Sequence, residues 1–196
     1  LAASGIENAQ LYESLSKSQL ETIYRFRPRV SVMMNLTPDH LDRYTTMGEY
    51  ARAKAALWRN QVSADIAVVN ADTERYLARL GFSPRSRVIR YSLWDETADW
   101  WFDGQRIRGS VLEAAGIEAR LDQTRLRGPH NAENIMATLA VAQALGIDPA
   151  KTWKSISSYR PLAHRLQTVG IAKGIEFVND SKATNVDAME KAILSF

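Results

Sequence analysis

The chain has 196 residues, of which 45% are hydrophobic and 24% charged, and this balance indicates a folded globular protein. Its formal net charge is only +3 and its lysines and arginines are scattered, so a nucleic-acid partner is not indicated. The absence of cysteine excludes a disulfide framework, a cysteine-based zinc site and a cysteine nucleophile. No apolar run reaches membrane-spanning length, and residues 1–10 lack the pattern of a signal peptide. We therefore expect a cytoplasmic chain without membrane insertion.

Short β-branched runs alternate with helical patterns, which predicts an α/β fold with a mostly parallel sheet flanked by helices. Residues 30–34 and 66–69 are expected to form buried strands, with Asp72 capping the helix that follows the second. Residues 100–107 are expected to form a hairpin that turns at Asp103-Gly104. Helices are expected at 47–60, 132–145, 149–158 and 186–195.

The pattern changes near residues 160–163, where Arg-Pro-Leu-Ala is typical of a linker. A new strand at 175–178 and a further helix follow it. We therefore predict one domain over 1–160, incomplete at its N-terminus, and the truncated beginning of a second over 161–196. The five tryptophans and the adjacent Met33 and Met34 are interpreted as core residues.

A polar segment at 35–44 directly follows the first predicted strand, at the sheet edge where open α/β folds bind ligands. It contains His40 between Asp39 and Asp42, and one imidazole with two carboxylates suits a divalent cation. The same segment also fits a capped turn, with Thr37 as the N-terminal cap of a helix. The spacing alone leaves both interpretations open.

The helix predicted at 47–60 carries a lysine on its apolar face. Thr46 and Glu49 form a capping-box pattern at its start. Lys54 falls in the middle of the face that Tyr50 shares with other apolar residues. A lysine there either extends its ammonium group to solvent or is buried, and burial lowers a lysine pKa and leaves more reactive amine. Lys54 is therefore a candidate functional residue.

The segment 128–134, Gly-Pro-His-Asn-Ala-Glu-Asn, places two asparagines on one face of a first helical turn. The amides of Asn131 and Asn134 can read both donors and acceptors of a ligand, or they can cap the helix. His130, beside the turn, is interpreted as a structural or exposed histidine.

A second polar loop, at 179–185, lies between the strand at 175–178 and the last helix. Asp180 is suited to a metal or a ribose and Lys182 to an anion, at the ligand-binding edge of the strand. The alternative is a plain connecting loop with Asn185 as the helix cap. Upstream, Arg165 is either a phosphate ligand or an ordinary surface arginine.

Taken in this order, these segments resemble the Mur ligases, enzymes of bacterial peptidoglycan synthesis. The resemblance covers roughly residues 19–196, with matching order and spacing. Its most specific part is Asp-Ser-Lys-Ala-Thr-Asn at 180–185, the form found in the members that add D-glutamate. The matching segments are 35–43, 53–54, 70–72, 128–134, 164–165 and 179–185.

The resemblance implies a three-domain monomer whose P-loop-type central domain binds ATP and whose Rossmann-like C-terminal domain brings the amino acid. It implies ligation of D-glutamate to UDP-N-acetylmuramoyl-L-alanine through an acyl phosphate, with Mg²⁺ as cofactor. His40 and a carbamylated Lys54 match magnesium ligands. The other matches are residues that contact ATP, namely Asn131, Asn134, Arg165 and Asp180, and residues that hold D-glutamate, namely Lys182 and Thr184.

The chain also departs from the family pattern near its start. The family carries a phosphate-binding loop that has no counterpart here, and Ser14 occupies the position of a metal-binding glutamate, with Glu13 one residue out of register. We therefore expect no ligase activity from residues 1–196 alone. The alternatives are a non-catalytic nucleotide-binding module and a Mur-type or folate-type ligase for a different amino acid.

Overall fold

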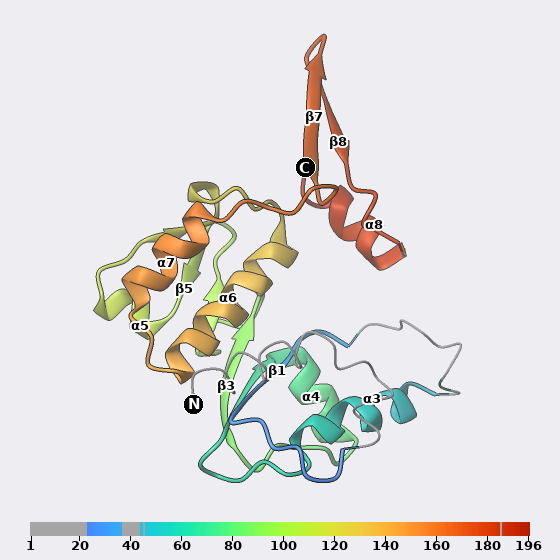
Figure 1. Ribbon diagram of the computed structural model, residues 1–196, viewed down its shortest axis with the longest axis vertical. Coiled ribbons are helices and arrows are strands. Elements are labelled where there is room, and N and C mark those ends of the chain that lie inside the picture. Colours follow the sequence, from blue (N-terminus) through green and yellow to red (C-terminus); the bar gives the residue numbers. More distant parts are fainter. Residues whose placement is uncertain (1–22, 37–43, 45, 185) are drawn as a thin grey trace.

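The computed structural model describes residues 23–36, 44, 46–184 and 186–196, and its largest element is a six-stranded sheet with helices on both faces (Figure 1). The first four strands run parallel, β5 pairs antiparallel with β4, and β6 pairs antiparallel with β5, so the predicted mostly parallel α/β fold is confirmed. In spatial order, the strands are β1 (Val30–Met33), β2 (Ile66–Asn70), β3 (Arg87–Ser92), β4 (Trp100–Phe102), β5 (Arg106–Arg108) and β6 (Ala119–Arg120).

Strand β2 shows why the sheet is covered on both sides. Its residues are almost continuously apolar and buried, as expected for a central parallel strand. Val68 packs into the core on one face, whereas Ala67 and Val69 pack into the core on the other. This opposite placement follows from the two-residue period of a strand.

The helices form two layers, one on each face of the sheet (Figure 1). The first layer contains α6 (Pro129–Ala144), which contacts β1 to β4, and α7 (Pro149–Ser158), which packs on α6. The second contains α3 (Met47–Ala55), the short 3₁₀ helix η1 (Ala56–Trp58) and α4 (Ala71–Arg79). Short helices α5 (Ser110–Ala114) and η2 (Leu121–Gln123) lie near the antiparallel edge.

Local sequence signals set most of the helix ends. The predicted capping box is present, since Thr46 and Glu49 bond to each other's backbone N–H groups. The predicted cap at Asp72 is wrong. Strand β2 runs on to Asn70, whose side chain accepts hydrogen bonds from the Asp72 and Thr73 amides and so caps α4. Asp148 caps α7, as its position before a proline predicts.

Two further expectations concern the core and the hairpin. The hairpin is confirmed as β4 and β5, closed by a bond from the Asp103 amide to the Arg106 carbonyl. The assignment of every tryptophan to the core is wrong, because Trp94 is 81% exposed. Met33 is buried as expected, but Met34 is 37% exposed, because the strand ends at Met33 and the next side chain leaves the core.

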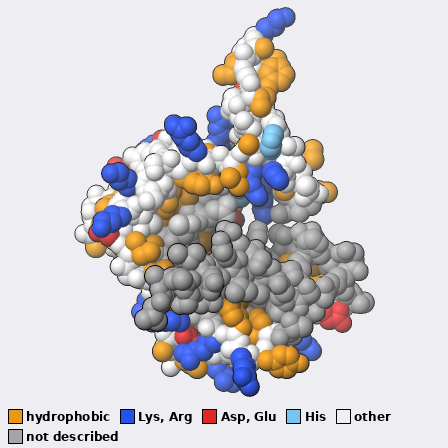
Figure 2. All heavy atoms as spheres, in the orientation of Figure 1, with side chains coloured by type: hydrophobic (Ala, Val, Ile, Leu, Met, Phe, Trp, Pro, Cys, Tyr) orange, Lys and Arg blue, Asp and Glu red, His pale blue; other side chains and the backbone are white. Residues whose placement is uncertain are grey.

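The C-terminal part forms a separate two-stranded sheet. β7 (Gln167–Ala172) pairs antiparallel with β8 (Ile175–Asn179), and α8 (Val186–Ile193) follows. Strand β8 and the last helix match the prediction, but the antiparallel partner β7 was not predicted. Figure 2 shows apolar side chains exposed along this hairpin. Val169, Ile171 and Phe177 are each more than half exposed. Within the described residues, no helix combines the length and apolar character needed to cross a bilayer.

Candidate functional site

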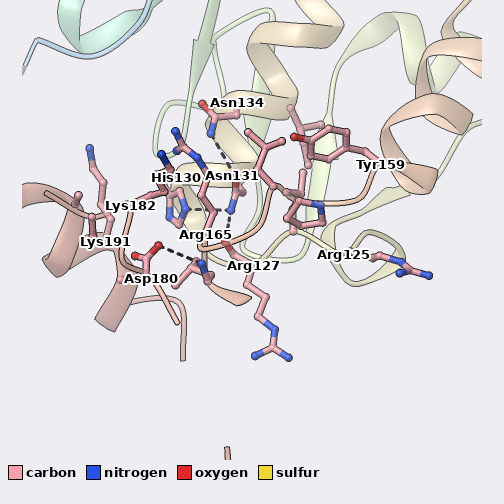
Figure 3. A pocket seen from close by; sticks show the side chains of 18 of the residues that line it. Arg125, Arg127, His130, Asn131, Asn134, Tyr159, Arg165, Asp180, Lys182 and Lys191 are labelled. Atoms are coloured by element: carbon pink, nitrogen blue, oxygen red, sulfur yellow. Dashed lines mark hydrogen bonds between the residues drawn. The ribbon is translucent and has the colours of Figure 1, made fainter. Parts of the chain in front are cut away.

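A cavity of about 750 Å³ opens where α6 begins, between that helix, the end of α7 and the segment from residue 161 to α8 (Figure 3). Its walls include the side chains that the sequence singled out from three separate segments. These side chains are Asn131, Asn134, Arg165, Asp180 and Lys182. Residues up to 51 positions apart in the chain therefore line the same cavity. Their spacing in the sequence alone does not predict this.

The cavity wall is strongly cationic. Among the described residues, five basic side chains line it, whereas Asp180 is the only carboxylate. Clustered charges of one sign in a cleft raise the local concentration of ligands of the opposite sign. The wall therefore favours an anionic ligand. The basic residues are Arg125, Arg127, Arg165, Lys182 and Lys191.

The first turn of α6 supplies the neutral polar groups. Gly128 lies before the helix with a φ of 85°, and Pro129 occupies the first helical position, where its missing N–H is not needed. The Asn131 amide nitrogen donates to the Arg127 carbonyl at 2.7 Å and meets Nε2 of His130 at 3.0 Å. Asn134 donates to Oδ1 of Asn131 at 3.3 Å. The predicted pair is thus in direct contact, and neither asparagine is the helix cap.

His130 is half-buried in the same wall. Burial holds the pKa of His130 below its ordinary value, Lys191 lowers it further, and Asp180 acts in the opposite direction. Its Nδ1 atom is buried and has no hydrogen-bond partner among the residues that the structure describes. The sequence left His130 as either a structural or an exposed histidine. The structure places its ring, half-buried, in the wall of the cavity.

On the opposite wall, hydrogen bonds join the loop at residues 164–166 to the loop at residues 180–182. Asp180 accepts a hydrogen bond from the Leu166 amide at 3.1 Å, and the Lys182 amide donates to the His164 carbonyl at 3.2 Å. Leu166 and His164 both have positive φ values, 43° and 67°, so the chain turns sharply there. Arg165 lies between these two residues and reaches the cavity (Figure 3).

The other candidate residues lie elsewhere. Thr184 is exposed and does not line the cavity. Lys54 is half-buried on α3, also outside the cavity, with its ammonium nitrogen 5.8 Å from the centre of the Tyr50 ring. His40 and Glu13, and with them Ser14, fall outside the described residues. The described part of the chain holds no cluster of three His, Cys, Asp or Glu side chains suited to a metal ion.

Sequence reasoning missed three basic residues of the wall, namely Arg125, Arg127 and Lys191. Arg127 directly precedes Gly128-Pro129, so its closeness to a ligand-binding helix start was a usable signal. Lys191 lies inside α8, more than 50 positions beyond the asparagines, and only the packing of α8 against the cavity identifies it.

Comparisons with known proteins identify the family of this chain. The family model of the Mur ligase middle domain matches residues 12–142. A UDP-N-acetylmuramoylalanine–D-glutamate ligase of Pelotomaculum thermopropionicum is 42% identical over 183 residues, which cover 93% of this chain and 40% of the relative. One of Geotalea daltonii is 39% identical over 198 residues, covering the whole chain and 43% of the relative. The chain thus spans about two fifths of the length of these curated relatives.

Solved structures show the same fold. MurF from Acinetobacter baumannii superposes with a TM-score of 0.65 at 19% identity, over 84% of this chain and 36% of that one. A UDP-N-acetylmuramoyl-L-alanyl-D-glutamate–2,6-diaminopimelate ligase superposes with a TM-score of 0.57 at 23% identity, over 74% of this chain and 31% of that one. Since the middle-domain model covers more than half of its residues, the chain belongs to the Mur ligase family.

Proposed function

We propose that this chain provides the nucleotide-binding part of an ATP-dependent ligase that adds D-glutamate to UDP-N-acetylmuramoyl-L-alanine in peptidoglycan synthesis. The observation that carries the proposal is the cationic cavity that brings Asn131, Asn134, Arg165 and Asp180 together. Its volume of about 750 Å³ lies in the usual range of small-molecule sites. The proposed substrates are those in the names of the curated relatives.

Each wall of the cavity suits a different part of the nucleotide. The Asn131–Asn134 pair offers the amide group of Asn134 to the base, and Arg165 offers a planar cation to a phosphate. Asp180 is suited to a ribose hydroxyl. Lys182, and Thr184 beyond the cavity, are assigned to the carboxylates of D-glutamate.

The proposed reaction has two steps. The terminal carboxylate of the UDP-sugar substrate attacks the γ-phosphorus of ATP, giving an acyl phosphate and ADP. The amine of D-glutamate then attacks the acyl carbon, and inorganic phosphate leaves as the amide forms. Both steps develop negative charge on phosphate oxygens, so a fixed cation such as Arg165 lowers their barriers.

Magnesium is the expected cofactor, but the described residues alone do not form its site. His40 lies outside them, and the ammonium group of Lys54 is a cation unless it is modified. We assign Lys54 a carbamate, formed with carbon dioxide, which would turn it into an anionic metal ligand. Its half-buried position, next to the Tyr50 ring, supports the accessible yet sheltered amine that this modification needs.

The carbamate is tested by equilibrating the protein with ¹³C-bicarbonate and recording the carbamate carbon by NMR. We expect one protected signal that is absent from Lys54→Ala and present in Lys151→Ala, a control at an exposed lysine of α7. A spectrum in which the two variants are identical would refute the assignment.

The remaining features of the proposal concern the whole protein. Residues 1–160 are assigned to the ATP-binding central domain and 161–196 to the beginning of the amino-acid-binding domain. We propose that the native protein is a cytoplasmic monomer. Size-exclusion chromatography with light scattering, and fractionation of the source cells, test these two assignments.

The test of function is ATP binding and phosphate release by the native chain that contains this sequence. We expect phosphate release to require both UDP-N-acetylmuramoyl-L-alanine and D-glutamate. Arg165→Ala is expected to weaken ATP binding at least tenfold, the scale of one charge-assisted hydrogen bond. Arg79→Ala, at an exposed arginine of α4, is the control and is expected to bind normally. Turnover that is indifferent to D-glutamate would exclude this ligase.

A second candidate is a nucleotide-binding module without catalysis. The observation that favours it is Ser14 at the position where the family carries a metal-binding glutamate. Such a module binds ATP through the same cavity but releases no phosphate. Tight ATP binding without turnover, in the presence of both substrates, would favour this candidate over the ligase.

A further inference from the structure

The side chain of Asn131 is almost fully engaged by the protein itself. Its two amide hydrogens point to the Arg127 carbonyl, 2.7 Å away, and to Nε2 of His130, 3.0 Å away. Its oxygen accepts from Asn134 at 3.3 Å. An amide nitrogen has two hydrogens, so no donor of Asn131 is left for a ligand.

This contact fixes the protonation of His130. The amide nitrogen of Asn131 can only donate, so Nε2 of His130 must be the acceptor. A neutral ring with an unprotonated Nε2 carries its hydrogen on Nδ1, the atom that is buried without a partner in the described part of the chain. A protonated ring carries a hydrogen on both nitrogens. Its Nε2–H would then face the donating amide nitrogen of Asn131, and the hydrogen bond between them would be lost.

Asn134 is placed differently. It gives one amide hydrogen to Asn131, and neither its second hydrogen nor its side-chain oxygen has a partner among the described residues. Its side chain is exposed at the cavity wall (Figure 3). A donor next to an acceptor on one amide matches the edge of adenine, which also offers one of each, whereas guanine offers two acceptors on its equivalent edge.

We propose that His130 is a positioning residue, which holds Asn131 through Nε2 so that Asn131 in turn orients Asn134 toward the nucleobase. This inference rests on the proposed nucleotide-binding function. His130 itself contacts no ligand in this arrangement. Its effect on binding passes through two hydrogen bonds, from Asn131 to His130 and from Asn134 to Asn131.

Two substitutions separate this role from simple packing. In His130→Gln the amide oxygen can reach approximately the place of Nε2 and keep the acceptor. In His130→Asn the side chain is one methylene shorter than that of glutamine, so its amide oxygen cannot reach this place. In the native chain that contains this sequence, we expect ATP affinity within about threefold of wild type for His130→Gln and about tenfold weaker for His130→Asn, the scale of one hydrogen bond. The preference for ATP over GTP is expected to fall only in His130→Asn.

A measurement without nucleotide tests the same contact directly. The ¹⁵N spectrum of the labelled ring of His130 is expected to show the hydrogen on Nδ1 and an unprotonated Nε2. Equal ATP affinities for the two variants, or a hydrogen on Nε2, would overturn the proposal. If the wild-type protein binds no ATP, the proposed function fails, and the ring spectrum alone then decides whether His130 holds Asn131.

Discussion

Arg127, in the loop that leads into α6, donates from Nη1 to both carboxylate oxygens of Glu176 on β8, at 2.9 and 3.0 Å. The hydroxyl of Thr168 on β7 donates to the same carboxylate, and the Arg127 guanidinium lies 5.4 Å from the centre of the Phe196 ring. One arginine of the cavity wall therefore connects the C-terminal hairpin and the end of the chain to the start of α6.

The first prediction concerns this pair. The pKa of Glu176 is lowered, first by the Thr168 hydroxyl and then by Arg127. A lowered pKa means that the folded state favours the carboxylate, so the stabilisation is present above pH 4.5, the ordinary value, and is lost as the pH falls through the folded pKa. We expect Glu176→Gln to speed amide hydrogen exchange in β7 and β8 at neutral pH, without changing exchange in β1 to β3.

A matched control is Glu118→Gln. Glu118 pairs with Arg106 at 3.2 Å, but both residues belong to the edge of the six-stranded sheet. This variant should leave exchange in the hairpin unchanged. If Glu176→Gln and Glu118→Gln affect β7 and β8 equally, the pair with Arg127 does not hold the hairpin.

The second prediction concerns the packing of Gly109 against Trp100. A Cβ atom at Gly109 would lie 2.6 Å from Cε3 of the Trp100 ring, and that ring is only 1% exposed. The ring cannot move away without disturbing the core, so Gly109→Ala should lower the free energy of unfolding by about 1–3 kcal/mol. Gly48→Ala, on α3, is the control, because the nearest atom to its Cβ would be the Thr46 hydroxyl oxygen, 3.8 Å away. It should be neutral or stabilising by up to about 1 kcal/mol. Similar losses in the two variants, measured by urea unfolding, would contradict this packing argument.

The sequence predicted best the features that depend on local chemistry. The capping box at Thr46 and the Asp148-Pro149 helix start involve residues within a few positions of each other, and both are present. The hairpin turn at Asp103 also follows from short-range preferences. The cap at Asp72 was mispredicted because β2 is one residue longer than its β-branched run, which moves the cap to Asn70.

Features that depend on tertiary packing were harder to predict. Strand β7 carries Gly170 in its middle and lies exposed along its whole length, so it lacks the buried apolar alternation that marks a strand. Trp94 has a large apolar side chain of the kind usually found in a core, but it lies two residues after Ser92, the last buried position of β3. The cavity itself was predictable only in part. The motifs identified Asn131 and Arg165, but only the fold brings Lys191 beside them.

The third prediction tests the corrected helix cap. Asn70 is 5% exposed, accepts two amide hydrogen bonds at the start of α4 and donates to Glu133 at 2.9 Å. Asn70→Ala should therefore lower the free energy of unfolding by about 1–3 kcal/mol. Asp72→Ala removes an exposed side chain that makes no cap, so a change of about 0.5 kcal/mol or less is expected. Chemical denaturation of the two variants compares them, and a larger loss in Asp72→Ala would restore the original assignment.

The fourth prediction follows from the charge state of His130. Burial and Lys191 lower its pKa, with Asp180 opposing them, so the folded state disfavours the protonated ring. A lowered histidine pKa means that the unfolded chain binds more protons, so stability is complete above the ordinary value of 6.5 and declines as the pH falls toward the folded pKa. Thermal unfolding of wild type and His130→Gln at a series of pH values isolates this effect, because other titrating groups are common to both proteins. We expect the wild type to lose stability more steeply than His130→Gln below pH 6.5, and parallel curves would show that the ring titrates as it does in the unfolded chain.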